Sequence, residues 1–345
     1  MPWLSLRGHD RAVELLRRAM AGGRLPHAFL FVGPEGVGKR AFAVRLAQTL
    51  LCERVPAAEL APCGACPGCV QVLGGTHPDV LSVARPEDKH ELPIRVIRDL
   101  CLDLGLKPAR GGRKVAIVDD ADAMNEEAAN AFLKTLEEPP EGSVLILIGT
   151  SAETQLDTII SRCRVLRFDP LSAAELAAVL LEQGVVDDDG DAERLAVLGE
   201  GSVARARGLA DPALVDFRRR LFDDIAAPNG FDAPALAGRV DAFVKAAGKE
   251  GAAQRDRARL VIGELVRLFR GTTWAGAGLA PPTPDPHDRK AIAALIQRVD
   301  AEASLALTDR CLEADYHVRR KAAMNLTLAS LAHDIGKLTS PHLRG

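Results

Sequence analysis

One short stretch of the chain has residue types and spacing that could bind a phosphate, and it reads GPEGVGKR. It matches the phosphate-binding pattern G-x-x-x-x-G-K-[S/T] at every position except the last. The N–H groups around Gly33, Gly36 and Gly38 can point into such a loop, and the ammonium group of Lys39 can reach the outer phosphates. Arg40 replaces the hydroxyl residue that would bind Mg²⁺, which predicts a hydrolysis-defective site. Two interpretations stay open: a loop that binds ATP, and a loop that only keeps an ancestral shape.

A pair of carboxylates follows an apolar run in KVAIVDDADAMN. In a Walker B element the first carboxylate, here Asp119, holds Mg²⁺, and the second residue orients the attacking water. That second residue is normally Glu, and Asp120 is shorter by one methylene group. The alternative is that Asp120 and Asp122 cap the following helix. The glycine-rich loop earlier in the chain favours the Walker B interpretation.

Four of the seven cysteines lie close together in the sequence. Cys63, Cys66 and Cys69 form a double C-x-x-C, and Cys52 precedes them. Four thiolates joined by two tight turns are typical of a tetrahedral structural Zn²⁺ site. A cluster of reduced thiols and an iron–sulfur cluster are the alternatives, and His77 competes with Cys52 as the fourth ligand.

Polar residues also follow the apolar run VLILI and precede the run VLRF. Thr150 or Ser151 would end a strand next to the loop strand, where a side chain can sense a γ-phosphate. Arg162 would stand between a short helix and the next strand, from which a guanidinium group can reach a neighbouring subunit and stabilise transition-state charge. Composition alone favours a solvated edge for Arg162, Arg164 and Arg167, and only the surrounding motifs favour the catalytic interpretation.

The elements that must position these residues follow from the hydrophobic pattern. A helix is expected at 9–21, and helical periodicity lies between most of the apolar runs. This alternation predicts a parallel, doubly wound α/β sheet. Short helices are expected at 173–182, 191–198 and 203–210, followed by a helical region that an exposed loop at 271–288 interrupts. The runs expected to form strands are 28–32, 80–83, 115–118, 144–148 and 165–168.

The chain has 345 residues, which suggests two or three domains. Hydrophobic residues make up 47% and charged residues 26%, and the formal net charge of -3 gives no overall attraction to nucleic acid. The first residues become charged too early for a signal peptide, and no run reaches membrane-spanning length. The clustered cysteines fit a reducing compartment. A cytoplasmic location is expected.

Taken together, these motifs resemble the clamp-loader branch of the AAA+ ATPases, from Gly8 to about residue 210. The segments LKTLEEPP and SRC, at 161–163, are far more specific to that branch than the glycine-rich loop is. The other matching segments are LPHAFLFVGPEGVGKR, CGACPGC, THPDV and KVAIVDDADAMNEEAANAF.

The resemblance implies an AAA+ P-loop module at 1–169 with a zinc knuckle at 52–69, a small helical lid at 170–211 and an all-α collar domain at 212–345. It implies a five-subunit ring with tau or gamma motor subunits and a delta subunit, which loads a sliding clamp onto primed DNA. The motor subunits carry a complete G-K-[S/T], whereas this chain has Lys39 followed by Arg40. The resemblance therefore implies a stator-type subunit that supplies Arg162 in trans. A lid arginine that senses nucleotide corresponds to Arg205, one position later than in the G-S-x-R pattern. The alternative is an active ATPase motor that uses its own loop.

Overall fold

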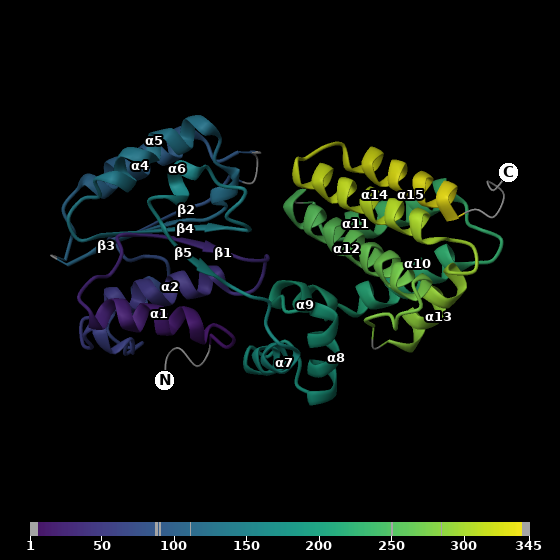
Figure 1. Cartoon of the computed structure of the whole chain (residues 1–345), viewed down its shortest axis with the longest axis horizontal. Helices are drawn as coiled ribbons and strands as arrows, with labels where there is room; N and C mark the ends of the chain where they lie inside the picture. The colour runs from purple at the N-terminus through teal and green to yellow at the C-terminus, as the bar shows by residue number, and fades with distance from the viewer. Residues whose placement is uncertain are drawn as a thin grey trace. The chain divides into compact units, whose positions relative to one another are not determined.

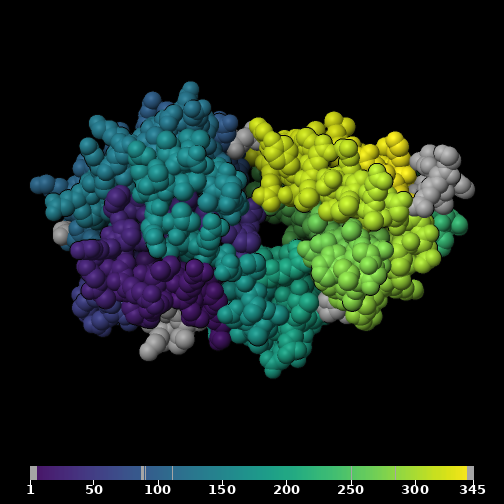
Figure 2. Space-filling model, viewed as in Figure 1, coloured from purple at the N-terminus to yellow at the C-terminus, as the bar shows by residue number. Residues whose placement is uncertain are grey.

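The computed structural model describes residues 6–86, 89, 91–110, 112–249, 251–283 and 285–339. By its contacts the chain divides into two compact units. One comprises Met1–Gln183 with Glu200–Ala204, and the other comprises Gly184–Gly199 with Arg205–Gly345. Figure 1 labels the elements, and Figure 2 shows how side chains fill the space between the ribbons within each unit. Among the described residues, no helix is long and apolar enough to cross a membrane.

A five-stranded parallel sheet forms the centre of the first unit, with the order β2-β3-β4-β1-β5. Every residue of β1, β3 and β4 is buried, because helices cover both faces of the sheet. These strands therefore appear in the sequence as continuous apolar runs, and the predicted parallel sheet is confirmed. The strands are β1 (Ala28–Val32), β2 (Val80–Val83), β3 (Lys114–Val118), β4 (Ser143–Gly149) and β5 (Arg164–Arg167).

Two hydrophobic cores lie on the two faces of this sheet. Figure 1 shows α1 (Asp10–Ala21) and α2 (Lys39–Leu50) on one face, and α4 (Ile94–Gly105) and α5 (Glu126–Glu137) on the other. Because side chains alternate along a strand, Phe29 and Phe31 of β1 join the core with α1 and α2, whereas Leu30 joins the core with α4 and α5. The ring of Phe31 lies 5.6 Å from that of Phe42 and 5.1 Å from that of Phe168, which ties β1, α2 and the end of β5 together.

The register of the sheet brings three strand ends to one edge. Val32 at the end of β1 lies beside Gly149 at the end of β4, and Val118 at the end of β3 lies beside Leu147 of β4. In open α/β sheets, ligands bind outside the carboxyl ends of the strands. The loop after β1, the carboxylates after β3 and the polar residues after β4 therefore share this edge.

Shorter helices complete the first part of the chain. The helices expected at 173–182, 191–198 and 203–210 are present as α7, α8 and α9, and Ser172 begins α7 with a capping box to Glu175. The contact division assigns parts of the predicted lid at 170–211 to both units, and the boundaries at 169 and 211 stay predictions. These elements are η1 (Ala57–Glu59), α3 (Pro67–Leu73), η2 (Ala121–Ala123), α6 (Asp157–Ile160), α7 (Ala173–Glu182), α8 (Asp189–Gly199) and α9 (Val203–Leu209).

The rest of the second unit is helical. Its longest helix, α12, continues through residues 271–276, and α13 begins at Pro286. The exposed loop expected at 271–288 is therefore wrong at both ends. Gly271 lies so close to Ile292 that a Cβ would be 2.6 Å from its side chain, and the buried Thr272 donates its hydroxyl to the carbonyl of Leu268. Packing therefore overrides the weak helix propensity of glycine and threonine. The helices are α10 (Pro212–Ala226), α11 (Ala233–Lys245), α12 (Gly251–Gly276), α13 (Pro286–Leu295), α14 (Ala301–Arg319) and α15 (Met324–Thr339).

A buried group of charges joins α10, α12 and α13. The side chain of Arg218 on α10 is 4% exposed and that of Glu264 on α12 is 2% exposed, and their Nε and Oε2 atoms lie 2.6 Å apart. Arg218 also pairs with Asp288 on α13. Glu264 receives two more guanidinium groups, from Arg205 at 3.1 Å and from Arg267 at 3.3 Å. Removing Glu264 would leave the buried guanidinium of Arg218 with only Asp285 and Asp288 as partners, which is costly because a buried charge then loses part of its compensation.

We expect Glu264→Gln to lower the free energy of unfolding of the helical unit by about 3 kcal/mol, because it leaves the charge of Arg218 buried with one carboxylate fewer. Asp224→Asn is the matched control, since Asp224 pairs with Arg239 at 2.6 Å while both side chains are more than a third exposed. The control should change stability by less than about 0.5 kcal/mol. Urea unfolding followed by circular dichroism measures both, and equal losses would contradict the prediction.

Candidate functional site

The glycine-rich loop lies between β1 and α2, as the sequence predicts. Gly33, Gly36 and Gly38 all have positive φ angles, of 152°, 76° and 105°. A Cβ on Gly33 would lie 2.1 Å from the carbonyl oxygen of Phe168, and one on Gly36 would lie 2.2 Å from the hydroxyl of Ser202. A Cβ at Gly33 would therefore clash with backbone, and at Gly36 the left-handed φ angle favours glycine.

Lys39 begins α2 and is buried. Its ammonium group donates hydrogen bonds to the carbonyl oxygens of Gly33 and of Pro34, the latter at 2.6 Å. Burial lowers the pKa of Lys39. The loop thus closes around its own lysine, and a phosphate that binds there must compete with two carbonyl groups for the ammonium.

Arg40 lies against the first Walker B carboxylate. Its Nη1 atom donates to Oδ2 of Asp119 at 2.7 Å, and its Nη2 atom lies 3.4 Å from the hydroxyl of Ser82. The other carboxylate oxygen of Asp119 accepts the backbone N–H of Asp120 at 3.3 Å. A guanidinium group is therefore bound to the carboxylate that would hold Mg²⁺, and both oxygens of that carboxylate already have hydrogen-bond donors.

The remaining carboxylates at this edge do not cap α5. Asn125 caps that helix, because its side chain accepts the N–H of Ala128 at 2.9 Å. Asp120 has a left-handed backbone with φ of 52°, and its carboxylate lies 4.0 Å from Nε of Arg85. The structure therefore places Asp120 next to Asp119 at the strand end, without the capping role that was the alternative.

Asp122 is a central residue of this edge that the sequence interpretation missed as part of the site. Its Oδ2 atom accepts the N–H of Thr150 at 2.6 Å and the hydroxyl of Thr150 at 2.7 Å. Its Oδ1 atom accepts from Thr154 and Gln155 at 2.7 and 2.6 Å. The carbonyl of Thr150 in turn accepts the N–H of Gly33 at 3.0 Å. Asp122 thus holds the predicted sensor residue, and the available sequence signal was the third carboxylate in VDDADAMN.

Arg162 lies two residues after α6, the short helix that packs against α5. Its guanidinium donates to Oε1 of Glu137 through Nε at 2.9 Å and through Nη2. Its Nη1 atom donates to the carbonyl of Thr158 at 2.9 Å and to the hydroxyl of Ser161 at 3.0 Å. Among the described residues, its hydrogen-bond partners thus lie on α5, on α6 and at the residue that follows α6, and not in the glycine-rich loop.

Arg205, the predicted lid sensor, lies in the second unit. Its Nη2 atom is 3.1 Å from Oε1 of Glu264, so it takes part in the buried charge group of the helical unit. The role in nucleotide sensing stays a prediction.

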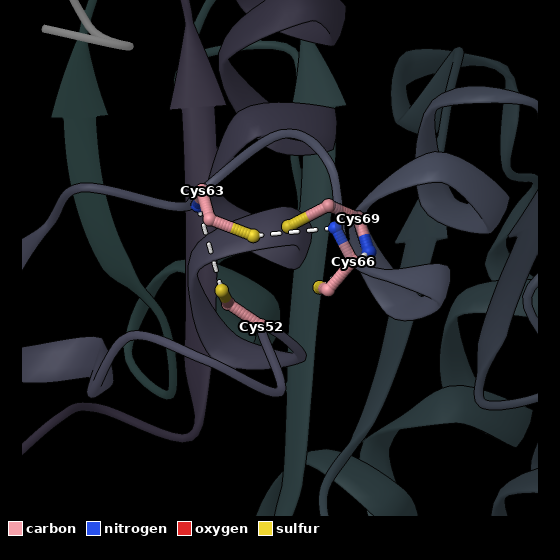
Figure 3. Close-up of side chains that lie close together, drawn as sticks. All are labelled: Cys52, Cys63, Cys66 and Cys69. Carbon is pink, nitrogen blue, oxygen red and sulfur yellow. Dashed lines mark hydrogen bonds between the residues drawn. The ribbon is translucent and has the colours of Figure 1, made fainter.

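The four predicted metal ligands do come together. Figure 3 shows the side chains of Cys52, Cys63, Cys66 and Cys69 converging, and their Sγ atoms all lie within 4.8 Å of one another. Among the described residues, no other group of three or more His, Cys, Asp or Glu side chains lies close enough together to hold a metal ion. Zn–S bonds of about 2.3 Å in a regular tetrahedron put sulfurs about 3.8 Å apart, so the cluster fits a metal ion of this size.

Backbone N–H groups favour a thiolate at Cys52 and Cys66, whereas burial raises the pKa of Cys69. The N–H groups of Cys66 and Cys69 point at the sulfurs of Cys63 and Cys66, at 3.3 and 3.4 Å. Burial alone would raise the pKa of Cys52, but nearby backbone N–H groups, including that of Cys63, outweigh it and lower the pKa to about 6. His77 lies outside the cluster, and its Nδ1 atom accepts the N–H of Asp79 at 3.1 Å. The geometry therefore favours Cys52 as the fourth ligand.

The strand–loop–helix order, the parallel sheet and the residues at its edge define a P-loop α/β protein. Residues 8–172, which include the loop, the carboxylates, the cysteine cluster and Arg162, match the family model described as "DNA polymerase III, delta subunit". Relatives named delta′ also match this chain, and together these similarities support a delta′-type clamp-loader subunit. The resemblance seen in the sequence is thereby confirmed.

The chain is 41% identical over 209 residues to DNA polymerase III subunit delta′ of Pseudomonas aeruginosa, covering 59% of this chain and 62% of that protein. It is also 32% identical over 211 residues to DNA polymerase III subunit tau of Escherichia coli. That match covers 60% of this chain and 32% of the tau subunit. A crystal structure of a gamma-subunit-related protein from Thermotoga maritima matches with a TM-score of 0.46 and 20% identity, covering 94% and 99%. The aligned region thus spans less than two thirds of these curated relatives.

We expect Cys66→Ser to remove a bound metal ion from the purified protein and to lower its melting temperature, because a structural metal stabilises only the folded chain. Wild type should carry about one ion per chain by elemental analysis. Cys101→Ser is the control, since Cys101 lies on α4 and accepts a hydrogen bond from Thr135 at 3.2 Å, outside the cluster. A metal-free wild type with the same melting temperature as Cys66→Ser would refute the metal site.

Proposed function

We propose that this chain is a delta′-like stator subunit of a cytoplasmic DNA polymerase III clamp loader. Its partners would be tau or gamma motor subunits and a delta subunit in a five-membered ring, which places a sliding clamp on primed DNA. Its own nucleotide site would be hydrolysis-defective, and Arg162 would act on the nucleotide of the adjacent motor subunit. The observation that carries this proposal is the 2.7 Å ion pair between Arg40 and Asp119.

That ion pair opposes magnesium chemistry for two reasons. Mg²⁺ needs several oxygen ligands at near-octahedral geometry, and Arg40 replaces one of them. The guanidinium charge also neutralises Asp119 and repels a second cation at the same carboxylate. ATP could still bind through Lys39 and the loop N–H groups, but the chain would lack the metal that offsets charge during phosphoryl transfer.

Two further features support the assignment. Arg162 is about one third exposed, and a guanidinium group suits the charge on a transferring phosphoryl group. The four cysteines form an all-sulfur ligand set, which favours Zn²⁺ in a closed, structural site. The zinc knuckle would then stabilise the fold, without a role in the reaction.

Arg40→Thr should restore magnesium dependence to the chain's own site, because it removes the competing cation and adds a hydroxyl ligand. We expect Mg²⁺ to raise ATP affinity about tenfold in this variant and to have little effect in wild type. Lys39→Ala in the Arg40→Thr background should abolish the gain. Steady ATP turnover by the wild-type chain alone, lost in Lys39→Ala, would instead establish the free-standing ATPase.

Arg162→Ala should slow ATP hydrolysis at the motor subunit's site that faces this chain by about 10³-fold, the usual contribution of an arginine finger. Single-turnover hydrolysis in the assembled complex measures that site, with a motor variant inactive at the other sites. Arg164→Ala is the matched control, because it removes an exposed arginine two positions later on β5. An unchanged rate with Arg162→Ala would remove the trans role.

A further inference from the structure

The guanidinium group of Arg162 has almost no hydrogen-bonding capacity left. An arginine side chain has five N–H donors, and four of those of Arg162 have partners within the described residues. Two point at one oxygen of Glu137, one at the carbonyl of Thr158 and one at the hydroxyl of Ser161. The remaining donor is a single N–H on Nη2.

The edge that Glu137 covers is the one a phosphate would use. Arginine binds phosphate most strongly with a pair of parallel N–H groups, and Nε with Nη2 forms such a pair. In this structure both of these atoms face Oε1 of Glu137. A phosphate and the carboxylate therefore compete for the same edge of the same side chain.

The position of Glu137 makes it a replaceable partner. It is the last residue of α5, where the negative end of the helix dipole disfavours a carboxylate. Its side chain is 49% exposed and that of Arg162 is 33% exposed, so water screens the pair. Such exposed ion pairs contribute little to stability, and a nucleotide polyphosphate carries more charge than one carboxylate.

We infer that Glu137 holds Arg162 in a resting position and that the nucleotide of the neighbouring subunit replaces Glu137 on the guanidinium. The inference rests on the proposed trans role of Arg162 and describes how that contact is regulated. In the resting chain Glu137 neutralises the arginine. When the neighbouring nucleotide binds, its phosphate replaces the carboxylate of Glu137 at Nε and Nη2 of Arg162. The hydrogen bonds from Nη1 to Thr158 and Ser161 hold the guanidinium group in place during this exchange.

The test is Glu137→Gln in the assembled complex, which keeps the size of the side chain and removes its charge. We expect kcat/KM for ATP at the adjacent motor site to rise about fivefold. The reason is that a glutamine binds the guanidinium group more weakly than a carboxylate does, so less interaction free energy is lost when Arg162 leaves residue 137. Glu138→Gln is the matched control: it removes an exposed carboxylate one position later and should leave kcat/KM unchanged. In an Arg162→Ala background, Glu137→Gln should have no effect.

The outcomes separate this inference from the proposed function. If Arg162→Ala lowers the rate and Glu137→Gln leaves kcat/KM unchanged, the exchange is refuted and the trans role stands. If Glu137→Gln lowers kcat/KM, Glu137 positions the arginine for catalysis and the resting role is wrong. If Arg162→Ala leaves the hydrolysis rate at the adjacent motor site unchanged, the proposed trans role is refuted, and the inference about Glu137 is refuted with it. Thermal melting of each variant confirms that the chain is folded.

Discussion

The parallel register of β1, β4 and β3 is the constraint on which the site depends. It brings residues that are far apart in sequence, such as Arg40 and Asp119 or Asp122 and Thr150, to one edge of the sheet. The register is firm because these strands are buried on both faces, and a slip by one residue would exchange the two cores. A side chain at this edge can therefore be replaced by one of another chemical type while the backbone positions that the strands fix are retained.

The edge shows one such change. A phosphate loop normally works with a divalent cation bound between its hydroxyl residue and the strand-end carboxylate. Here the side chain of Arg40 donates to the strand-end carboxylate of Asp119, and its positive charge stays covalently attached to the chain. The guanidinium charge of Arg40 can preserve the shape of the loop and its contact with Asp119. Unlike a bound divalent cation, it cannot move with a transferring phosphate. The same side-chain type, at Arg162, is proposed to serve the neighbouring site.

Much of this could be predicted from sequence. The five strands and most helices follow from apolar runs and helical spacing, and the cysteine cluster follows from the spacing of Cys63, Cys66 and Cys69. The features that the sequence did not predict depend on contacts between residues that are distant in the sequence. Residues 271–276 remain helical because Gly271 packs on Ile292, and Asp122 matters because of where β4 ends. Arg205 pairs with Glu264, a residue that no local motif marks. Register and packing decide these features, and neither can be read from a single short segment.

The buried charges of the helical unit have a consequence for how it responds to its surroundings. Arg218 and Glu264 are shielded from solvent ions, so added salt should leave their attraction nearly intact while it weakens surface pairs such as Arg239 with Asp224. The cost of removing charges from water also falls on heating, because hydration of ions becomes less favourable. The helical unit is thus held by an interaction whose relative weight grows with temperature, whereas the hydrophobic contribution per unit area levels off.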